Sequence, residues 1–223
     1  MILAPLLLAA AAPATTDRAA IEAIVRDYIL THPEILPEAM SRLQSRETAN
    51  AITANRDGIF KPFGNAWEGA ADADVTIVQF FDYDCGYCRR SLPDIARLLS
   101  EDKLLRVVYR EFPVLGPGSE VAAKVSLAAA RGSNYPAFHR AMYAAKDLTQ
   151  AEIDKVAARY AVKPTSDPAI AKEIEANRAL ARPLGLTGTP SWVIGDQVLS
   201  GAVGYDALKA AIAVARKKSA AAG

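Results

Sequence analysis

Two cysteines, Cys85 and Cys88, are the residues of this chain whose type and spacing point most directly to chemistry. They are the only cysteines among 223 residues, and they form the sequence Cys-Gly-Tyr-Cys. A disulfide across two intervening residues removes little chain entropy, so a purely structural role is disfavoured. A zinc site needs more ligands than two thiols supply, and His32 and His139 lie far from the pair without ligand spacing. A redox couple fits the pattern best.

The sequence around the pair places Cys85 where a strand ends and a helix begins. Residues 75–81 read VTIVQFF, a continuous apolar run typical of a strand covered on both faces. Residues 89–100 have a helical pattern. The free N–H groups and the positive end of a helix stabilise a thiolate. Cys85 is therefore predicted to be the exposed nucleophile that attacks a substrate disulfide. Cys88, one turn into the helix and more buried, is predicted to resolve the mixed disulfide.

A second segment, GLTGTPSWVIG at 185–195, is expected to complete the site. Pro190 stands at the start of a predicted strand, where proline is tolerated. A cis bond before Pro190 would turn the backbone of Thr189 towards a bound peptide. Only about 5–6% of X-Pro bonds in folded proteins are cis, so the sequence alone does not establish this bond.

The rest of the pattern predicts an α/β domain preceded by a helical arm. Strands are expected at 75–81 and 104–112, and a hairpin at 190–200. The helices that the pattern predicts are 17–31, 33–50, 89–100, 118–131, 134–146, 150–160, 167–182 and 205–217. A strand, a helix and a strand at this spacing predict a parallel βαβ unit. The Gly-, Pro- and Asn-rich segment 53–74 is predicted to join the arm to the domain.

The arm carries an apolar stripe that needs a partner. Spacings of three and four residues gather large apolar side chains on one side of each arm helix. They are Ile21, Ile24, Val25, Tyr28 and Ile29 in the first helix, and Leu36, Met40 and Leu43 in the second. Such a stripe is buried either against its own domain or against copies of itself. The sequence leaves both arrangements open.

Composition and the N-terminus suggest an exported protein. The chain has 26 basic and 25 acidic residues, and this balance gives no reason to expect a nucleic-acid partner. The opening MILAPLLLAAAAPATT resembles a secretory signal peptide with a candidate cleavage site at residues 12–14, although no Lys or Arg precedes Arg18. Residues 1–14 are predicted to be that signal, and the mature chain to enter an oxidising compartment.

On these motifs the chain resembles the DsbA-like branch of the thioredoxin superfamily. The resemblance covers about residues 58–218 and rests on CGYC after FFDYD, on GTP before WVIG, and on the helical block between them. The arm IVRDYILTHPEILPEAMSRLQ is similar to the N-terminal region of ScsC-type disulfide isomerases. The resemblance implies a thioredoxin fold over residues 55–223 with a helical insertion at about 117–184, preceded by an oligomerisation arm at 15–54.

The same resemblance implies roles for individual residues. Cys85 would be the nucleophile, Cys88 the resolving thiol, Pro190 the cis-proline and Thr189 its substrate-contacting neighbour. Tyr87, between the cysteines, would tune access to the pair and its redox potential.

One position departs from the family pattern. Members commonly have a buried glutamate six residues before the first cysteine, which relays protons to the buried thiol, and this chain has Gln79 there. An amide does not titrate, so a relay must use water or another group, for which Glu111 is a candidate. Gln79 either favours the Cys85 thiolate by removing a nearby negative charge or is a hydrogen-bonded core amide. Asp82 and Asp84 would oppose the thiolate if they lie close to it.

Three functions remain open. The arm favours a periplasmic disulfide isomerase that reshuffles misfolded exported proteins, forms a homotrimer through residues 17–47, and receives electrons from a membrane-bound thiol donor. The alternative is a monomeric DsbA-like dithiol oxidase. A third reading, from the copper-tolerance link of the ScsC-type resemblance, is a Cu(I)-binding protein that uses the same soft thiolates. No cofactor and no resident metal site are expected.

Overall fold

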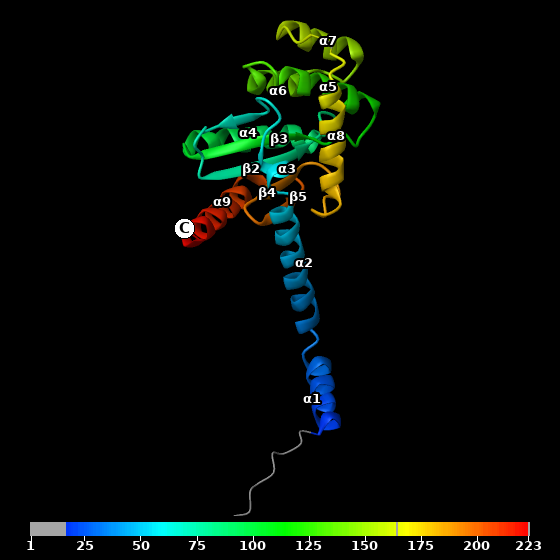
Figure 1. The fold of residues 1–223 in the computed structure, drawn as a ribbon, viewed down its shortest axis with the longest axis vertical. Helices are drawn as coiled ribbons and strands as arrows, with labels where there is room; N and C mark the ends of the chain where they lie inside the picture. Colours follow the sequence, from blue (N-terminus) through cyan, green and yellow to red (C-terminus); the bar gives the residue numbers. More distant parts are fainter. Residues whose placement is uncertain (1–16, 164, 223) are drawn as a thin grey trace, which may run out of the picture. The chain divides into compact units, whose positions relative to one another are not determined.

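The computed structural model describes residues 17–163 and 165–222 and divides the chain into two units (Figure 1). The first unit ends at Gln44 and the second begins at Ser45. The predicted signal peptide, residues 1–14, lies outside the described residues. Within the described ranges, no helix has both the length and the apolar character needed to cross a bilayer.

The first unit contains helix α1 (Arg18–Thr31) and the beginning of α2 (Ile35–Ala54). The start of α1 is capped by Asp17, whose carboxylate accepts a hydrogen bond from the Ala19 N–H at 3.1 Å. The helix ends at Thr31 with His32 as its C-cap, because the residue before a proline disfavours the α conformation. The apolar stripe is exposed on both helices, with Ile24 68% and Met40 71% accessible.

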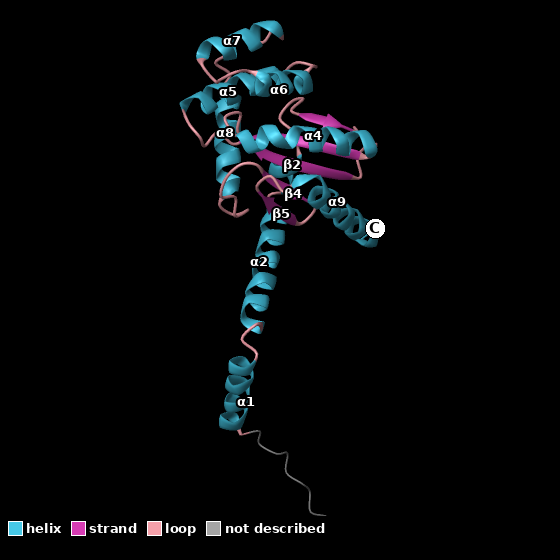
Figure 2. Ribbon diagram, turned by 180° about the vertical axis from the view of Figure 1, so that it is seen from behind, coloured by secondary structure: helices cyan, strands magenta, loops and turns pink. Residues whose placement is uncertain are grey.

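The second unit is built on a five-stranded sheet with the order β1-β3-β2-β4-β5 (Figure 2). The strands are β1 (Trp67–Gly69), β2 (Val75–Phe81), β3 (Leu105–Glu111), β4 (Ser191–Ile194) and β5 (Gln197–Ser200). β2 and β3 are parallel, whereas the β1–β3, β2–β4 and β4–β5 pairs are antiparallel. The parallel pair and the terminal hairpin confirm the predicted α/β topology.

Helices cover both faces of this sheet. They are α3 (Arg56–Phe60), α4 (Gly86–Glu101), α5 (Pro117–Ala129), α6 (Tyr135–Ala144), α7 (Gln150–Arg159), α8 (Pro168–Ala181) and α9 (Gly204–Ala222). Ile77 of β2 faces a core shared with α4, α6 and α9, and Val78 faces a second core shared with α3 and α8. The burial of both faces explains why β2 reads as a continuous apolar run.

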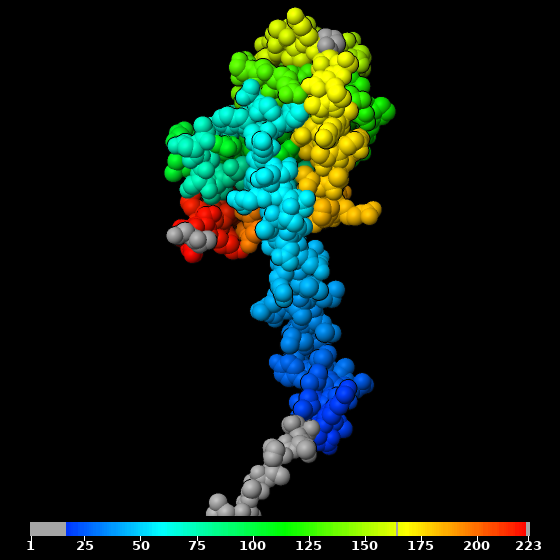
Figure 3. Space-filling model, in the orientation of Figure 1, coloured from blue at the N-terminus to red at the C-terminus, as the bar shows by residue number. Residues whose placement is uncertain are grey.

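Helices α5 to α8 form the helical insertion between β3 and β4. Figure 3 shows α8, in yellow, on the surface of this helical insertion. All four helices begin within one residue of the positions that periodicity predicted, because each carries a regular apolar face and a recognisable start. Asp167 caps α8 by accepting from the Ala169 N–H at 2.9 Å.

The segment 53–74, predicted as a junction, contains regular structure of its own. α2 continues through Ala54, α3 follows at once, and β1 pairs with β3. Ile59 of α3 is fully buried in the second core. Elements this short show no periodicity in the sequence, and their stability comes from contacts with β3 and α8.

Candidate functional site

Cys85 is the N-cap residue of α4. Its Sγ accepts a hydrogen bond from the backbone N–H of Cys88 at 3.3 Å, and the helix begins at Gly86, three residues before its predicted start. The sulfur therefore takes the position that a capping oxygen usually occupies, next to the free N–H groups of the first turn. Both cysteines are present as free thiols. The two sulfurs therefore lie in the same turn of α4, with the backbone N–H of Cys88 directed at the Sγ of Cys85.

The two thiols differ in burial. Cys85 is 5% accessible and Cys88 is fully buried. The prediction that Cys85 is exposed is therefore wrong in degree, because the Thr189–Pro190 segment packs against its sulfur. Burial raises the pKa of the Cys88 thiol well above its usual range. Cys88 is thus protonated at neutral pH, and Cys85 is the more accessible of the two residues.

The Thr189–Pro190 bond is cis, as expected. The Cys85 thiol donates to the carbonyl oxygen of Thr189 at 3.2 Å. This turn is held from both sides, because the Gly201 N–H donates to the Pro190 carbonyl at 2.8 Å and the Ser191 hydroxyl donates to the Gly188 carbonyl at 2.7 Å. The start of β4 and the start of α4 therefore meet at the sulfur of Cys85.

Tyr87 and Asp84 lie at the surface of the same loop and helix turn. The Tyr87 ring is exposed, and the Arg90 guanidinium carbon lies 4.2 Å from its centroid. The Asp84 side chain is also exposed. The structure therefore places Tyr87 at the surface of the first turn of α4, two residues after Cys85.

Asp82 organises this region, which the sequence reasoning missed because it treated this residue only as a charge opposing the thiolate. It is buried, and its carboxylate accepts three backbone hydrogen bonds. The donors are the N–H groups of Asp84 at 2.8 Å, Val114 at 2.8 Å and Leu115 at 3.0 Å. The Asp82 carbonyl accepts two more, from the Cys85 N–H and the Tyr143 hydroxyl, each at 3.1 Å. An aspartate two residues before its bonded N–H is a common turn signal, but the contact with residues 114–115 has no sequence signature.

Gln79 and Glu111 both point into the core beneath α4 and α6. Gln79 is fully buried, and neither amide atom has a hydrogen-bond partner among the described residues, contrary to the expectation of a bonded core amide. Glu111, at the end of β3, is also buried. Burial raises the pKa of its carboxyl well above the ordinary value, although a hydrogen bond with Ser126 lowers it in part. Burial therefore favours the neutral, protonated form of Glu111.

A hydrogen-bonded cluster of aromatic side chains surrounds Glu111. The Tyr83 hydroxyl lies 2.9 Å from His139 Nδ1 and 2.9 Å from Ser126 Oγ, which lies 3.2 Å from the Tyr135 hydroxyl. Burial lowers the pKa of His139 to about 3, so its imidazole is neutral. Burial also raises the pKa of Tyr143, and the charges that Cys88 and Glu111 would carry raise it further.

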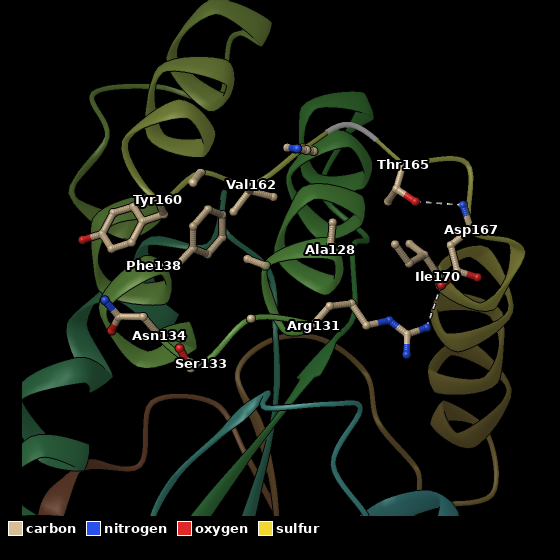
Figure 4. A pocket seen from close by; sticks show the side chains of 14 residues that line it. Ala128, Arg131, Ser133, Asn134, Phe138, Tyr160, Val162, Thr165, Asp167 and Ile170 are labelled. Atoms are coloured by element: carbon tan, nitrogen blue, oxygen red, sulfur yellow. Dashed lines mark hydrogen bonds and ion pairs between the residues drawn. The ribbon is translucent and has the colours of Figure 1, made fainter.

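The described ranges 17–163 and 165–222 contain no group of three or more His, Cys, Asp or Glu side chains suited to a metal ion. A hollow in the helical insertion, shown in Figure 4, is lined by α5, α6, α8 and the loop after α7. Phe138 and Tyr160 form one side of it, and Arg131 is bonded to Asp167 at 2.6 Å on the other. None of the predicted site residues lines this hollow, so it is separate from the thiol site.

Two family models match the chain. The model of the DSBA-like thioredoxin domain matches residues 76–213, more than half of the chain. The model of the copper resistance protein ScsC N-terminal domain matches residues 17–49.

Solved structures also match the parts of the chain that the two family models cover. A linker-deletion mutant of Proteus mirabilis ScsC is 29% identical, with a TM-score of 0.75 over 93% of this chain and 100% of its own. A thioredoxin-like oxidoreductase from Silicibacter pomeroyi DSS-3 is 36% identical, with a TM-score of 0.69 over 73% of this chain and 98% of its own. A periplasmic thioredoxin-like protein from Salmonella enterica serovar Typhimurium is 26% identical, with a TM-score of 0.67 over 73% of this chain and 95% of its own.

Among curated proteins, a Na(+)/H(+) antiporter NhaA 3 of Salinispora tropica is 26% identical over 77% of this chain. The chain spans only 29% of the length of that relative. The match of the domain model, the cis-proline opposite Cys85 and the similarity to ScsC agree with one another. The chain therefore belongs to the DSBA-like thioredoxin domain family, a family of thiol–disulfide oxidoreductases that includes ScsC.

Proposed function

We propose that this protein is a disulfide isomerase that reshuffles non-native disulfides in exported proteins, using the Cys85–Cys88 dithiol. The observation that carries the proposal is the placement of the Cys85 sulfur. It caps α4 and lies 3.2 Å from the Thr189 carbonyl, at the edge where a substrate chain can pair with the segment before Pro190. The nucleophile and the peptide-binding backbone are thus adjacent.

The reaction begins at Cys85. Its thiolate attacks one sulfur of a substrate disulfide, which forms a Cys85–substrate disulfide and releases the other substrate sulfur as a thiolate. A different substrate thiolate then attacks the substrate sulfur of the mixed disulfide. A new substrate disulfide forms, the Cys85 thiolate leaves, and the substrate undergoes no net oxidation.

Cys88 resolves a mixed disulfide that no substrate thiolate attacks. After losing its proton, its sulfur attacks Cys85, which forms the Cys85–Cys88 disulfide and releases the substrate as a thiolate. The substrate disulfide is reduced by two electrons and the protein is oxidised. A membrane-bound thiol donor then reduces the protein again. Burial raises the pKa of Cys88, which disfavours the thiolate that this step requires.

Glu111 and Gln79 influence how Cys88 gains and loses its proton. When the Cys85–Cys88 disulfide is opened at Cys85, Cys88 leaves as a buried thiolate and needs a proton. The buried carboxyl of Glu111, at the end of β3, is the proton source in this proposal. The neutral amide of Gln79 adds no charge to the same core, so Glu111 takes the role that a glutamate at position 79 would have.

The arm residues 17–47 form the interface of a homotrimer in this proposal. Their apolar stripe is exposed along both helices, and α1 contains no buried residue. The match of residues 17–49 to the ScsC N-terminal domain supports self-association through this segment. Several Cys85 sites around a shared substrate would then hold a misfolded chain while its disulfides exchange.

We place the protein in the periplasm, where misfolded disulfide-containing exported proteins are its substrates. The support is the apolar opening of the chain and the similarity to a thioredoxin-like protein described as periplasmic. An oxidising compartment also provides the disulfides on which an isomerase acts.

Recovery of activity from a scrambled-disulfide ribonuclease tests the proposal. The wild-type protein is expected to restore ribonuclease activity, and Cys85→Ser is expected to have none. A double variant, Ile24→Glu with Met40→Glu, introduces charge on the exposed stripe and is expected to lose isomerisation while still exchanging thiols. The matched control is Leu104→Glu, an exposed apolar site in the second unit. If the wild-type protein and the double variant only oxidise reduced ribonuclease, the protein is a monomeric DsbA-like dithiol oxidase.

Copper binding is a second candidate function for the same thiols. The N-terminal match to a copper resistance protein and the two free, adjacent thiols favour it. One equivalent of Cu(I) is expected to block alkylation of Cys85 without changing the circular dichroism spectrum. Unchanged alkylation in the presence of Cu(I) would rule this function out.

A further inference from the structure

The hydroxyl of Tyr143 reaches the thiol site from the helical insertion. Tyr143 lies in the last turn of α6 and is buried. Its hydroxyl donates to the Asp82 carbonyl at 3.1 Å, and the same carbonyl accepts from the Cys85 N–H at 3.1 Å. The ring is held in place by Phe81 and Tyr83, whose ring centroids lie 6.2 and 4.9 Å from its own. A distant segment of the chain therefore places a hydroxyl donor next to the backbone of the nucleophile.

The buried thiol of Cys88 needs hydrogen-bond donors when it leaves as a thiolate. When an incoming thiolate attacks Cys85 of the oxidised pair, a new disulfide forms at Cys85, the Cys85–Cys88 bond breaks, and Cys88 keeps the electron pair of that bond. Cys88 is fully buried, and its own N–H is directed at the Cys85 sulfur. Burial raises the pKa of the Cys88 thiol, and a hydrogen bond from the Asp82 backbone offsets that rise only in part. Each further donor that reaches the sulfur therefore stabilises the leaving thiolate.

The Tyr143 hydroxyl has the position and the chemistry of such a donor. Tyr143 and both cysteines belong to the same core cluster. Burial raises the pKa of Tyr143 well above its ordinary value, and the charge of a Cys88 thiolate and a hydrogen bond with that sulfur raise it further. The hydroxyl therefore keeps its proton at neutral pH. When it turns from the Asp82 carbonyl to the sulfur, that carbonyl still accepts from the Cys85 N–H, so no buried acceptor is left without a partner.

We propose that the Tyr143 hydroxyl turns from the Asp82 carbonyl to the Cys88 sulfur as that sulfur leaves, and that this hydrogen bond speeds the opening of the Cys85–Cys88 disulfide. The hydroxyl stabilises the charge and transfers no proton, so the thiolate still takes its proton from Glu111. This inference rests on the proposed roles of Cys85 and Cys88. It applies equally to an isomerase and to an oxidase, because the same bond is opened or formed in both cycles.

The test compares the wild-type protein with Tyr143→Phe, which keeps the buried ring and removes the hydroxyl. Each protein is oxidised, mixed with dithiothreitol at neutral pH and quenched with acid, and mass spectrometry after alkylation measures the disulfide that remains. Tyr143→Phe is expected to open about tenfold more slowly, as for the loss of one hydrogen bond to a charged group. Tyr135→Phe, at another buried tyrosine of α6 whose hydroxyl bonds to Ser126, is the matched control and is expected to open at the wild-type rate. Equal rates for Tyr143→Phe and the wild-type protein would overturn the inference.

A second measurement separates this role from a structural one. In the Cys88→Ser protein, Cys85 attacks oxidised glutathione, and the sulfur that leaves belongs to glutathione. Adding Tyr143→Phe to this protein is expected to slow the attack by less than about twofold, because the two positions are coupled only through the Cys88 sulfur.

A tenfold slowing of that attack would overturn the inference, since it would show that the hydroxyl acts on Cys85 through the Asp82 carbonyl. Slower opening in Tyr143→Phe, together with no isomerisation by the wild-type protein, would support the inference and overturn the proposed isomerase. A wild-type protein that forms no Cys85–Cys88 disulfide would overturn both.

Discussion

The thiol of Cys85 donates a hydrogen bond to the carbonyl of Thr189, a residue 104 positions further along the chain, across 3.2 Å. The same sulfur accepts from the Cys88 N–H at 3.3 Å. A protonated Cys85 therefore makes both bonds, whereas a thiolate keeps only the bond from Cys88. Ionisation frees the Thr189 carbonyl at the moment when the sulfur becomes a nucleophile.

Cys88→Ser is expected to trap the Cys85–substrate disulfide, because a serine hydroxyl does not attack a disulfide. Incubation with scrambled ribonuclease, followed by acid quenching and mass spectrometry, measures the adduct. Cys85→Ser is the control and is expected to form none. An adduct on Cys88 in that control would contradict the assignment of Cys85 as the nucleophile.

Glu111→Gln is expected to stabilise the protein increasingly as the pH rises above about 4.3, the usual pKa of glutamate. Burial raises the pKa of Glu111 in the folded state, so the native state holds a proton that the unfolded state loses. The wild-type protein therefore loses stability as the pH rises towards the folded pKa, by at most about 1.4 kcal/mol per pH unit. Urea unfolding between pH 4 and 8 measures the difference.

Glu152→Gln, on the partly exposed face of α7, is the control for this measurement. It is expected to follow the wild-type pH dependence. Parallel curves for wild type and Glu111→Gln would show that Glu111 is ionised in the folded protein.

His139→Gln is expected to flatten the loss of stability in acid. The folded-state pKa of His139 is about 3 because of burial, so the unfolded state binds a proton first as the pH falls below about 6.5. The stability linked to this histidine is complete above that pH and is lost as the pH falls towards 3, at up to about 1.4 kcal/mol per pH unit. His32→Gln, at the exposed histidine of the arm, should keep the wild-type slope. Identical slopes in all three proteins would exclude His139 as their source.

The double variant Ile24→Glu with Met40→Glu is expected to have a lower mass in solution than the wild-type protein. The exposed stripe supplies the apolar area for association, and two charges on it oppose burial. Light scattering coupled to size-exclusion chromatography measures the mass, with Leu104→Glu as the control. A monomeric wild-type protein would remove the trimer from the proposed function.

Sequence reasoning succeeded where the pattern is local. The apolar run of β2 and the periodic helices α5 to α8 follow from regular spacing, and the position of Cys85 at a helix start follows from the strand before it. It failed where a contact joins distant segments. β1 is three residues long and exists because it pairs with β3.

The role of Asp82 illustrates the same limit within the site. Its neighbours Asp84 and Cys85 are adjacent in sequence, whereas Val114 and Leu115 are not, and the fold alone brings their N–H groups to one carboxylate. The sequence shows that the carboxylate of Asp82 is close to the thiol. It does not show that the N–H groups of Val114 and Leu115 donate to this carboxylate.

The place of β2 in the sheet has a consequence for biosynthesis. β2 lies between β3 and β4, and β4 begins only at Ser191. While the chain is being synthesised, one edge of the apolar strand VTIVQFF stays unpaired until β4 has been made. Such an edge is prone to pair with other chains. The hairpin that contains β4 therefore protects the central strand from aggregation as well as carrying the cis-proline.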